Sequence, residues 1–262
     1  MNILLTGDSW GLGVFANVNN EYGPIGQGIE NLLQDKGHTV VNISCAGGSN
    51  WLMIDRLEGR WDRSDKCIFG VNPQDKKHFD LDKIDLIIFL QTDIFRERSY
   101  YVLEKVGGAS FDWKVLEQQF VESLLKYNSI DDFSNQYFDS LYQKLNSFNK
   151  TVLCIGGWAK LHPAIEKFDN LVPIIYSATK LLIPDLVEDF YISDKEWFLQ
   201  LDQNTKIMEK FGHEVKTLAI ANADKLDQMI NHWQDVHPNL DGYVKIVEYL
   251  EPYLHKKIEK NC

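Results

Sequence analysis

Thr6-Gly7-Asp8-Ser9-Trp10-Gly11-Leu12-Gly13 is the stretch that decides the fold of this chain. It follows Ile3-Leu4-Leu5, an apolar run that is short and bounded by glycine, as a buried β-strand is. A strand that stops at Gly-Asp-Ser presents a small hydroxyl at the carboxyl edge of a sheet. Because open α/β sheets bind their ligands at that edge, we interpret Ser9 as a nucleophile around which the rest of the chain is arranged.

Length, composition and charge limit the classes of protein to consider. The 262 residues are enough for one large domain with a substantial core, and the apolar content of 44% is that of a soluble globular protein. The net charge of −11 argues against nucleic acid and against anionic membrane surfaces as partners, because both attract clustered Lys and Arg. We therefore expect neither nucleic acid nor a membrane surface as a partner.

The sequence shows no export or membrane segment. No apolar run approaches the roughly 18–20 residues that span a bilayer. Met1-Asn2 leads straight into a strand rather than into a basic and apolar signal. We therefore expect a cytoplasmic protein, although a component of a phage particle would look the same.

The cysteines predict neither a disulfide framework nor a thiolate zinc site. Cys45, Cys67, Cys154 and Cys262 are widely spaced and form no Cys-x-x-Cys pair. We expect small buried hydrophobic side chains and a loose thiol at Cys262.

Strands alternate with helices along the chain. Further strands are predicted at 38–43, 84–90, 151–155 and 171–176, with Pro173 placing the last at an edge of the sheet. Helical spacing of apolar residues predicts helices at about 24–36, 51–61, 112–127, 131–148, 185–190, 194–211, 214–231 and 240–258. Residues 17–23, 64–80 and 233–239 are predicted loops.

This alternation predicts a single α/β domain over 1–262, with a central parallel sheet of about five strands. The helices at about 112–149 are additional to a minimal domain. We expect this helical insertion to form a cap or wall over the site.

A serine nucleophile needs a base, a group that orients the base, and donors that face the developing oxyanion. The backbone N–H of Ser9 can be one donor, and Gly47-Gly48 lets backbone approach a ligand closely. The third strand ends in the polar residues Gln91-Thr92-Asp93. His237, followed by the rigid Pro238 just before the closing helix, is placed to be the base.

Four blocks of the chain together resemble the SGNH (GDSL-type) hydrolase superfamily. They are Gly7-Asp8-Ser9, the strand leading to Gly47, Thr92-Asp93, and His237-Pro238-Asn239. The resemblance implies a flavodoxin-like three-layer α/β/α sandwich and esterase activity without cofactors. It implies that Ser9 is nucleophile and oxyanion donor, that Gly47 is a second donor, and that His237 is the base.

The chain departs from the superfamily pattern at two positions. Where the superfamily has an oxyanion-hole asparagine, this chain has Thr92, whose hydroxyl could donate instead, or Gln91 could supply an amide. Where the superfamily has an aspartate three residues before the histidine, this chain has Gln234. Asp235 or a backbone carbonyl could then orient the imidazole. The resemblance predicts a serine esterase that acts on a small-molecule or carbohydrate ester with a small acyl group, O-acetyl groups of a carbohydrate being one candidate.

Two alternative functions stay open. An SGNH-like fold that kept Ser9 and His237 but lost hydrolysis would bind a ligand. In a NAD(P)-dependent short-chain dehydrogenase, Gly11-x-Gly13-x-x-Ala16 would cradle phosphates, and Tyr176 would be an acid assisted by Lys180. The second strand does not end in the acidic residue that such an enzyme uses to bind ribose, which argues against the dehydrogenase.

The remaining conspicuous side chains have structural interpretations. Asp8 is predicted to cap the turn that follows it, and His162 to lie on the surface. Trp10, Trp158 and Trp233 flank the predicted site loops, where they could line a sugar-binding wall or pack in the core.

Overall fold

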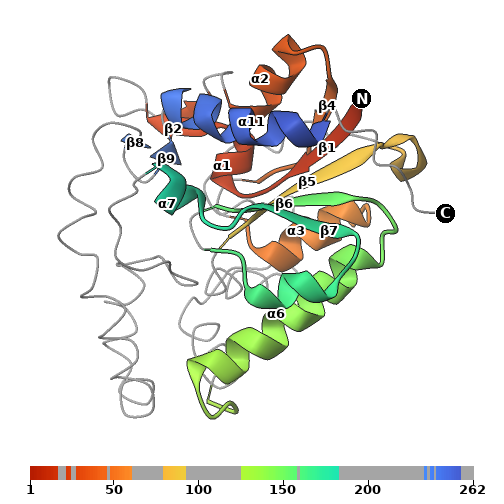
Figure 1. The fold of residues 1–262 in the computed structure, drawn as a ribbon, viewed down its shortest axis with the longest axis vertical. Coiled ribbons are helices and arrows are strands. Elements are labelled where there is room, and N and C mark those ends of the chain that lie inside the picture. Colours follow the sequence, from red (N-terminus) through yellow and green to blue (C-terminus); the bar gives the residue numbers. More distant parts are fainter. Residues whose placement is uncertain are drawn as a thin grey trace, which may run out of the picture.

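The computed structural model describes residues 1–16, 22–24, 28–45, 48–60, 79–92, 125–157, 160–182, 233–234, 237–238 and 240–254. Within these ranges, five strands form one parallel sheet (Figure 1). They are β1 (Asn2–Thr6), β4 (Thr39–Asn42), β5 (Leu86–Gln91), β6 (Val152–Gly156) and β7 (Leu171–Ile175). All five coincide with predicted strands to within two residues at each end.

The strand order is β4-β1-β5-β6-β7. Counted along the chain, this is the order 2-1-3-4-5 of flavodoxin-like doubly wound sheets, so the predicted fold class is confirmed. β1 pairs with both of its neighbours in register, so that Leu4 stands beside Val41 on one side and Ile87 on the other. Pro173 lies in β7, at the edge of the sheet, as predicted.

The sheet has a hydrophobic core on each face. Leu4 of β1 belongs to one core, whereas Ile3 and Leu5 belong to the other. The same alternation continues in β5, where Phe89 lies on the side of Leu4 and Ile88 on the side of Leu5. Because successive strand side chains point to opposite faces, strands that are apolar throughout need helices on both sides.

The helices on the Leu4 side of the sheet are α3 (Asn50–Leu57) and α6 (Ile130–Asn146) (Figure 1). Phe138 and Tyr142 of α6 are fully buried in that core. The helix begins at a serine cap, where Ser129 Oγ accepts the Asp132 N–H at 3.0 Å. The insertion predicted over 112–149 stays a prediction, and α6 occupies its second half. α6 lies in the crossover that a parallel pair such as β5 and β6 requires, and it covers the sheet.

On the other face lie α2 (Ile29–Asp35), α7 (Ala178–Leu182) and α11 (Leu240–Leu254) (Figure 1). Tyr243, Ile246 and Leu250 of α11 are fully buried among the residues of the second core. Gly37 follows α2 with φ of +86°, the left-handed conformation predicted for it. Two helical layers thus enclose the sheet.

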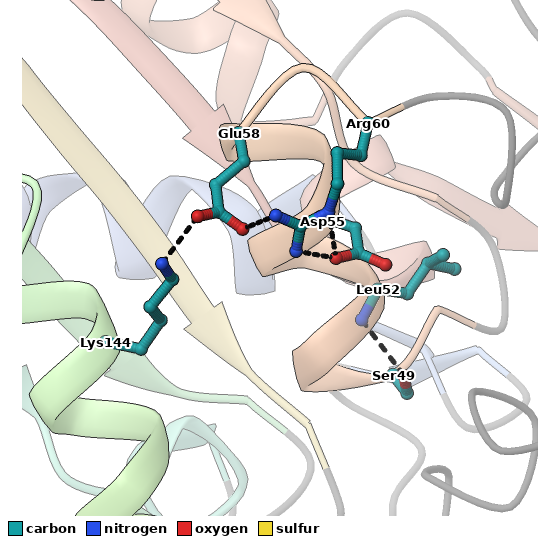
Figure 2. Close-up of polar contacts among 6 residues, drawn as sticks. All are labelled: Ser49, Leu52, Asp55, Glu58, Arg60 and Lys144. Atoms are coloured by element: carbon teal, nitrogen blue, oxygen red, sulfur yellow. Dashed lines mark hydrogen bonds and ion pairs between the residues drawn. The ribbon is translucent and has the colours of Figure 1, made fainter. Parts of the chain in front are cut away.

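An ion-pair cluster joins α3 to α6 (Figure 2). Arg60 Nε donates to Asp55 Oδ1 at 2.9 Å, and the same guanidinium pairs with Glu58. Glu58 in turn pairs with Lys144 of α6 at 2.5 Å. Asp55 is fully buried, whereas Lys144 is partly exposed, so the cluster runs from the core to the surface.

Two small antiparallel hairpins lie outside the central sheet. β2 (Val14–Ala16) pairs with β3 (Tyr22–Pro24), and β8 (Trp233–Gln234) pairs with β9 (His237–Pro238). Two expectations are corrected here. Pro24 belongs to a strand rather than to a first helical turn, because cross-strand pairing with Val14 holds it extended. The helix predicted from residue 24 begins at Ile29. The predicted loop at 233–239 contains paired strands.

Short 3-10 helices, η1 (Leu81–Lys83) and η3 (Pro163–Lys167), precede β5 and β7. The helices predicted over 112–124 and 185–231 lie outside the described residues, as do most of 64–80 and the end of the closing helix. Among the helices that the structure describes, none has the length and apolar character to cross a membrane.

Candidate active site

β1, β4 and β5 end side by side, and the residues that follow them form the candidate site. Between β1 and β5 the strand order changes direction, which is where doubly wound sheets bind ligands. The backbone after β1 and β4 stays paired beyond the strands. Ile43 N–H donates to the Leu5 carbonyl at 2.8 Å, and Cys45 N–H donates to the Gly7 carbonyl at 2.9 Å.

Ser9 is the first residue of α1 (Ser9–Leu12), directly after β1. Asp8 caps this helix, as predicted, and its Oδ1 accepts the Trp10 N–H at 2.9 Å. The helix ends after one turn at Gly13, whose φ of +76° is in the left-handed region that favours glycine. Ser9 is buried, with 7% of its surface exposed.

The turn that carries Ser9 packs closely against the residues after β4. Asn42 Nδ2 donates to the Gly11 carbonyl at 2.9 Å, and Asn42 Oδ1 accepts the Ser44 N–H at 3.0 Å. A Cβ at Gly11 would lie 2.4 Å from Ser44 Oγ, so the close approach requires glycine there. Sequence reasoning missed Asn42, although a polar residue at the end of a buried strand is a usable signal.

Arg56 of α3 fixes the same segment from the other side. Its Nη1 donates to the carbonyls of Ile43 and Ser44, at 2.8 and 2.9 Å, and the residue is buried. A buried guanidinium is unusual, and here it supplies donors to carbonyls that the strand no longer pairs. Sequence reasoning missed Arg56 because its position in an amphipathic helix looks like a solvent-facing one.

Thr92 follows β5 and is fully buried next to Asp8. Its Oγ1 donates to Asp8 Oδ2 at 2.9 Å. A hydroxyl has one hydrogen, and in this structure Asp8 accepts it. The arrangement therefore differs from the expectation that the Thr92 hydroxyl donates to an oxyanion.

Gln91, the other candidate amide donor, lies on the opposite face of β5. Its Nε2 donates to the Lys160 carbonyl at 2.7 Å, and its Oε1 accepts the hydroxyl of Tyr142 from α6. The side chain is thus engaged on the α6 side of the sheet and not beside Ser9. This placement follows from the alternation of side chains along a strand.

Tyr243 of the closing helix α11 lies within electrostatic reach of Asp8. Burial raises the pKa of its phenol well above the ordinary value, and the negative charge of Asp8 raises the pKa further. The phenol therefore stays protonated at neutral pH. The closing helix and the Ser9 turn meet at one end of the sheet.

His237 lies in β9, whose backbone contacts α1, β2 and α11. The chain segments that carry Ser9 and His237, separated by most of the sequence, are therefore neighbours. Gln234 pairs with His237 across the β8–β9 hairpin. Gly47, Asp235 and Trp158 lie outside the described residues, as do the side chains of Trp233, Gln234 and His237.

The residues proposed for a dehydrogenase are arranged differently. Gly13 ends a one-turn helix, whereas a dinucleotide fingerprint opens a long one. Tyr176 Oη donates to Glu166 at 2.6 Å, and this hydrogen bond, with burial, raises the pKa of Tyr176 to about 12. A catalytic tyrosine acid needs a lowered pKa, so Tyr176 beside Lys180 does not have the required electrostatics.

His162 and Trp10 are both core residues. His162 is buried, so the prediction that it lies on the surface is wrong. Its ring stacks on Phe138, and its Nδ1 accepts the Ala164 N–H at 3.2 Å. Trp10 is 1% exposed and packs in the second core. It therefore does not line a sugar-binding wall.

The cysteines differ in part from the expectation. Cys154 is buried in β6 with a free thiol, and burial raises its pKa. Cys45, expected to be a thiol, is disulfide-bonded, and its partner lies outside the described residues. Within the described ranges, no three His, Cys, Asp or Glu side chains are grouped to hold a metal ion.

Comparison with known proteins gives likenesses of structure only. No protein-family profile matches the chain, and no curated protein matches it in sequence. The chain is similar to the crystal structure of TesA at 15% identity, covering 97% of this chain and 98% of that one, with a TM-score of 0.36.

Two further solved structures are similar to the chain. The psychrotrophic esterase EstA from Pseudoalteromonas sp., inhibited by monoethylphosphonate, shares 14% identity over 97% of this chain and 99% of its own, with a TM-score of 0.34. LAE5, an alpha/beta hydrolase enzyme from the metagenome of Lake Arreo, Spain, shares 14% identity over 96% and 93%, with a TM-score of 0.35.

The class of this protein follows from its own topology. A five-stranded parallel sheet of order 2-1-3-4-5 between two helical layers defines a flavodoxin-like α/β/α sandwich. This is the fold that the resemblance to the SGNH superfamily implies. The serine of the first block stands where that fold binds its ligands.

Proposed function

We propose that this chain is a single-domain serine ester hydrolase of the SGNH type. The observation that carries the proposal is the packing of β9, which holds His237, against α1, which begins at Ser9. This supports the proposal because a serine hydroxyl and a histidine imidazole are the two groups that acyl transfer needs, and the end of β1 lies at the edge where doubly wound sheets bind ligands.

In the proposed reaction, Ser9 Oγ attacks the ester carbonyl while His237 takes the hydroxyl proton. The tetrahedral intermediate collapses, the bond from carbon to the alcohol oxygen breaks, and His237 gives its proton to the leaving alcohol. Water then attacks the acyl-serine, with His237 again as base, and releases the carboxylic acid. Asp235 or a backbone carbonyl orients the imidazole.

The backbone N–H groups of Ser9 and Gly47 are the proposed oxyanion donors. The first N–H groups of a helix point out of its N-terminal end, where they stabilise negative charge. Removal of one oxyanion donor lowers turnover on the order of 10²–10³-fold. A site without a third, side-chain donor would therefore turn over slowly. We propose a small-acyl ester as substrate, an O-acetylated carbohydrate being the first to test.

The test is covalent labelling of the full chain by a fluorophosphonate probe, with hydrolysis of short p-nitrophenyl esters measured in parallel. We expect the wild type to be labelled at Ser9 and Ser9→Ala to be unlabelled. His237→Ala should react more slowly by roughly 10³-fold or more. Ser140→Ala, which removes an exposed hydroxyl on α6, is the matched control and should react like the wild type.

A second function, ligand binding without hydrolysis, is favoured by the hydrogen bond from Thr92 to Asp8, which uses the hydroxyl expected in the oxyanion hole. A wild type that no ester or probe modifies, but that binds acetylated sugars in calorimetry, would support this function. Labelling that persists in Ser9→Ala would remove Ser9 from the mechanism.

A further inference from the structure

Both carboxylate oxygens of Asp8 are engaged, each by a different element. Oδ1 accepts the Trp10 N–H of α1, and Oδ2 accepts the hydroxyl of Thr92, which follows β5; both distances are 2.9 Å. Asp8, Trp10 and Thr92 are all at least 97% buried. The carboxylate therefore connects the first turn of α1, which carries Ser9, to the neighbouring strand.

Thr92 is itself held by the side chain of Asn50, the first residue of α3. Asn50 Oδ1 accepts the Thr92 N–H, and Asn50 Nδ2 donates to the Thr92 carbonyl, both at 2.9 Å. The amide thus pairs with the backbone of Thr92 as a further strand would. Nδ2 also donates to Tyr137 Oη of α6 at 3.1 Å. This chain of contacts links α6, through the partly buried Tyr137 and the buried Asn50, Thr92 and Asp8, to the turn of Ser9.

A hydrogen bond to a carboxylate is stronger than one between neutral groups, and it is stronger still where water is excluded. With Oδ2 held by Thr92, the Asp8 carboxylate has little freedom to rotate away from the Trp10 N–H. Loss of the Thr92 hydroxyl would leave a buried carboxylate oxygen without this donor. The first turn of α1 would then shift, and Ser9 with it.

We propose that Thr92 is a positioning residue for Ser9, acting through Asp8, and is not an oxyanion donor. The inference rests on the proposed function of Ser9 as nucleophile and adds to it the residue that holds the nucleophile in place. Small displacements of a reacting group have large kinetic effects, because attack requires a near-ideal approach. Thr92 should therefore influence the rate of reaction more than substrate binding.

The experiment compares the wild type with Thr92→Val and Thr92→Ala, which remove the hydroxyl, and with Thr92→Ser, which keeps it. The matched control is Thr6→Val, because Thr6 Oγ1 is buried in β1 with no hydrogen-bond partner among the described residues. Three quantities are measured: the rate of fluorophosphonate labelling, kcat and KM on short esters, and hydrogen exchange of the Trp10 amide by NMR.

For Thr92→Val and Thr92→Ala we expect kcat and the labelling rate to fall about ten- to hundredfold with KM nearly unchanged. Exchange of the Trp10 amide should accelerate on the order of tenfold relative to amides of β5. Thr92→Ser and Thr6→Val should retain wild-type values. Rescue by serine distinguishes the hydroxyl from the packing of the side chain.

The outcomes separate this inference from the proposed function. Wild-type labelling and exchange in Thr92→Val would overturn the positioning role, as would faster exchange with an unchanged labelling rate. Global unfolding of both hydroxyl-less variants would overturn it too, since the hydroxyl would then serve the whole fold. If no probe labels the wild type while exchange of the Trp10 amide still depends on Thr92, the proposed function fails. The same result would support the role of Thr92 in fixing the first turn of α1.

Discussion

At the scale of single residues, His162 shows how burial sets a proton equilibrium. Its ring stacks on Phe138, its Nδ1 caps η3, and its backbone N–H donates to Tyr142 Oη at 3.0 Å. Burial lowers the pKa of His162 below the ordinary 6.5, and the positive charge of Lys167 lowers it further. The folded protein therefore prefers the neutral imidazole.

The consequence is a stability that depends on pH. Below about pH 6.5 the unfolded chain takes up a proton at this residue that the folded chain does not. The contribution of His162 to the free energy of unfolding is therefore present above that pH and is lost as the pH falls through the lowered folded pKa. We expect urea denaturation to show a shallower decline between about pH 7 and pH 5 in His162→Asn than in the wild type.

Asparagine is the appropriate replacement because it can still cap η3 but does not titrate. Other groups change protonation over the same range, and the difference between the two proteins removes their contribution. Parallel pH profiles for wild type and His162→Asn would contradict the prediction.

At the scale of elements, two of the polar contacts that join α3 to its neighbours differ in burial. Arg56 is buried and donates to the carbonyls of Ile43 and Ser44 after β4. Lys144 of α6 pairs with Glu58 near the surface, where its side chain is 36% exposed. Water can replace the partner of Lys144 but not the partners of the two buried carbonyls.

We therefore expect Arg56→Met to destabilise the protein by about 2–4 kcal/mol, because two buried carbonyls lose a charged donor. Lys144→Met should lower the free energy of unfolding by less than about 1 kcal/mol. Urea denaturation of both variants checks the contrast, and methionine keeps most of the side-chain volume in each. Equal effects would show that burial does not decide the strength of these contacts.

At the scale of the whole molecule, β1 contributes buried side chains to the hydrophobic cores on both faces of the sheet. Leu4 and Leu5 are both fully buried, but they point into different cores. We expect Leu4→Ala and Leu5→Ala each to reduce the free energy of unfolding by about 2–5 kcal/mol. Tyr249→Ala, at a half-exposed position on α11, should change it by less than about 0.5 kcal/mol. A leucine variant with the small effect of Tyr249→Ala would contradict the three-layer arrangement.

Much of the architecture could be predicted because it depends on local pattern. The five apolar runs, the edge position of Pro173, the left-handed Gly37 and the cap at Asp8 all follow from residue type and spacing. The predictions that failed concern residues whose partners are distant. Pro24 pairs with Val14 in a hairpin, and His162 is covered by Phe138 of α6.

The candidate site divides in the same way. By itself the sequence determined that a serine follows the first buried strand and that polar residues end the third. Strand ends can be predicted because a buried strand is a short apolar run that stops where polar or small residues begin. Only the tertiary structure decided that the Thr92 hydroxyl goes to Asp8, that Gln91 faces α6, and that β9 packs against α1. The direction of a hydrogen bond depends on which acceptors the folded chain brings within reach, and that information is spread over the whole sequence.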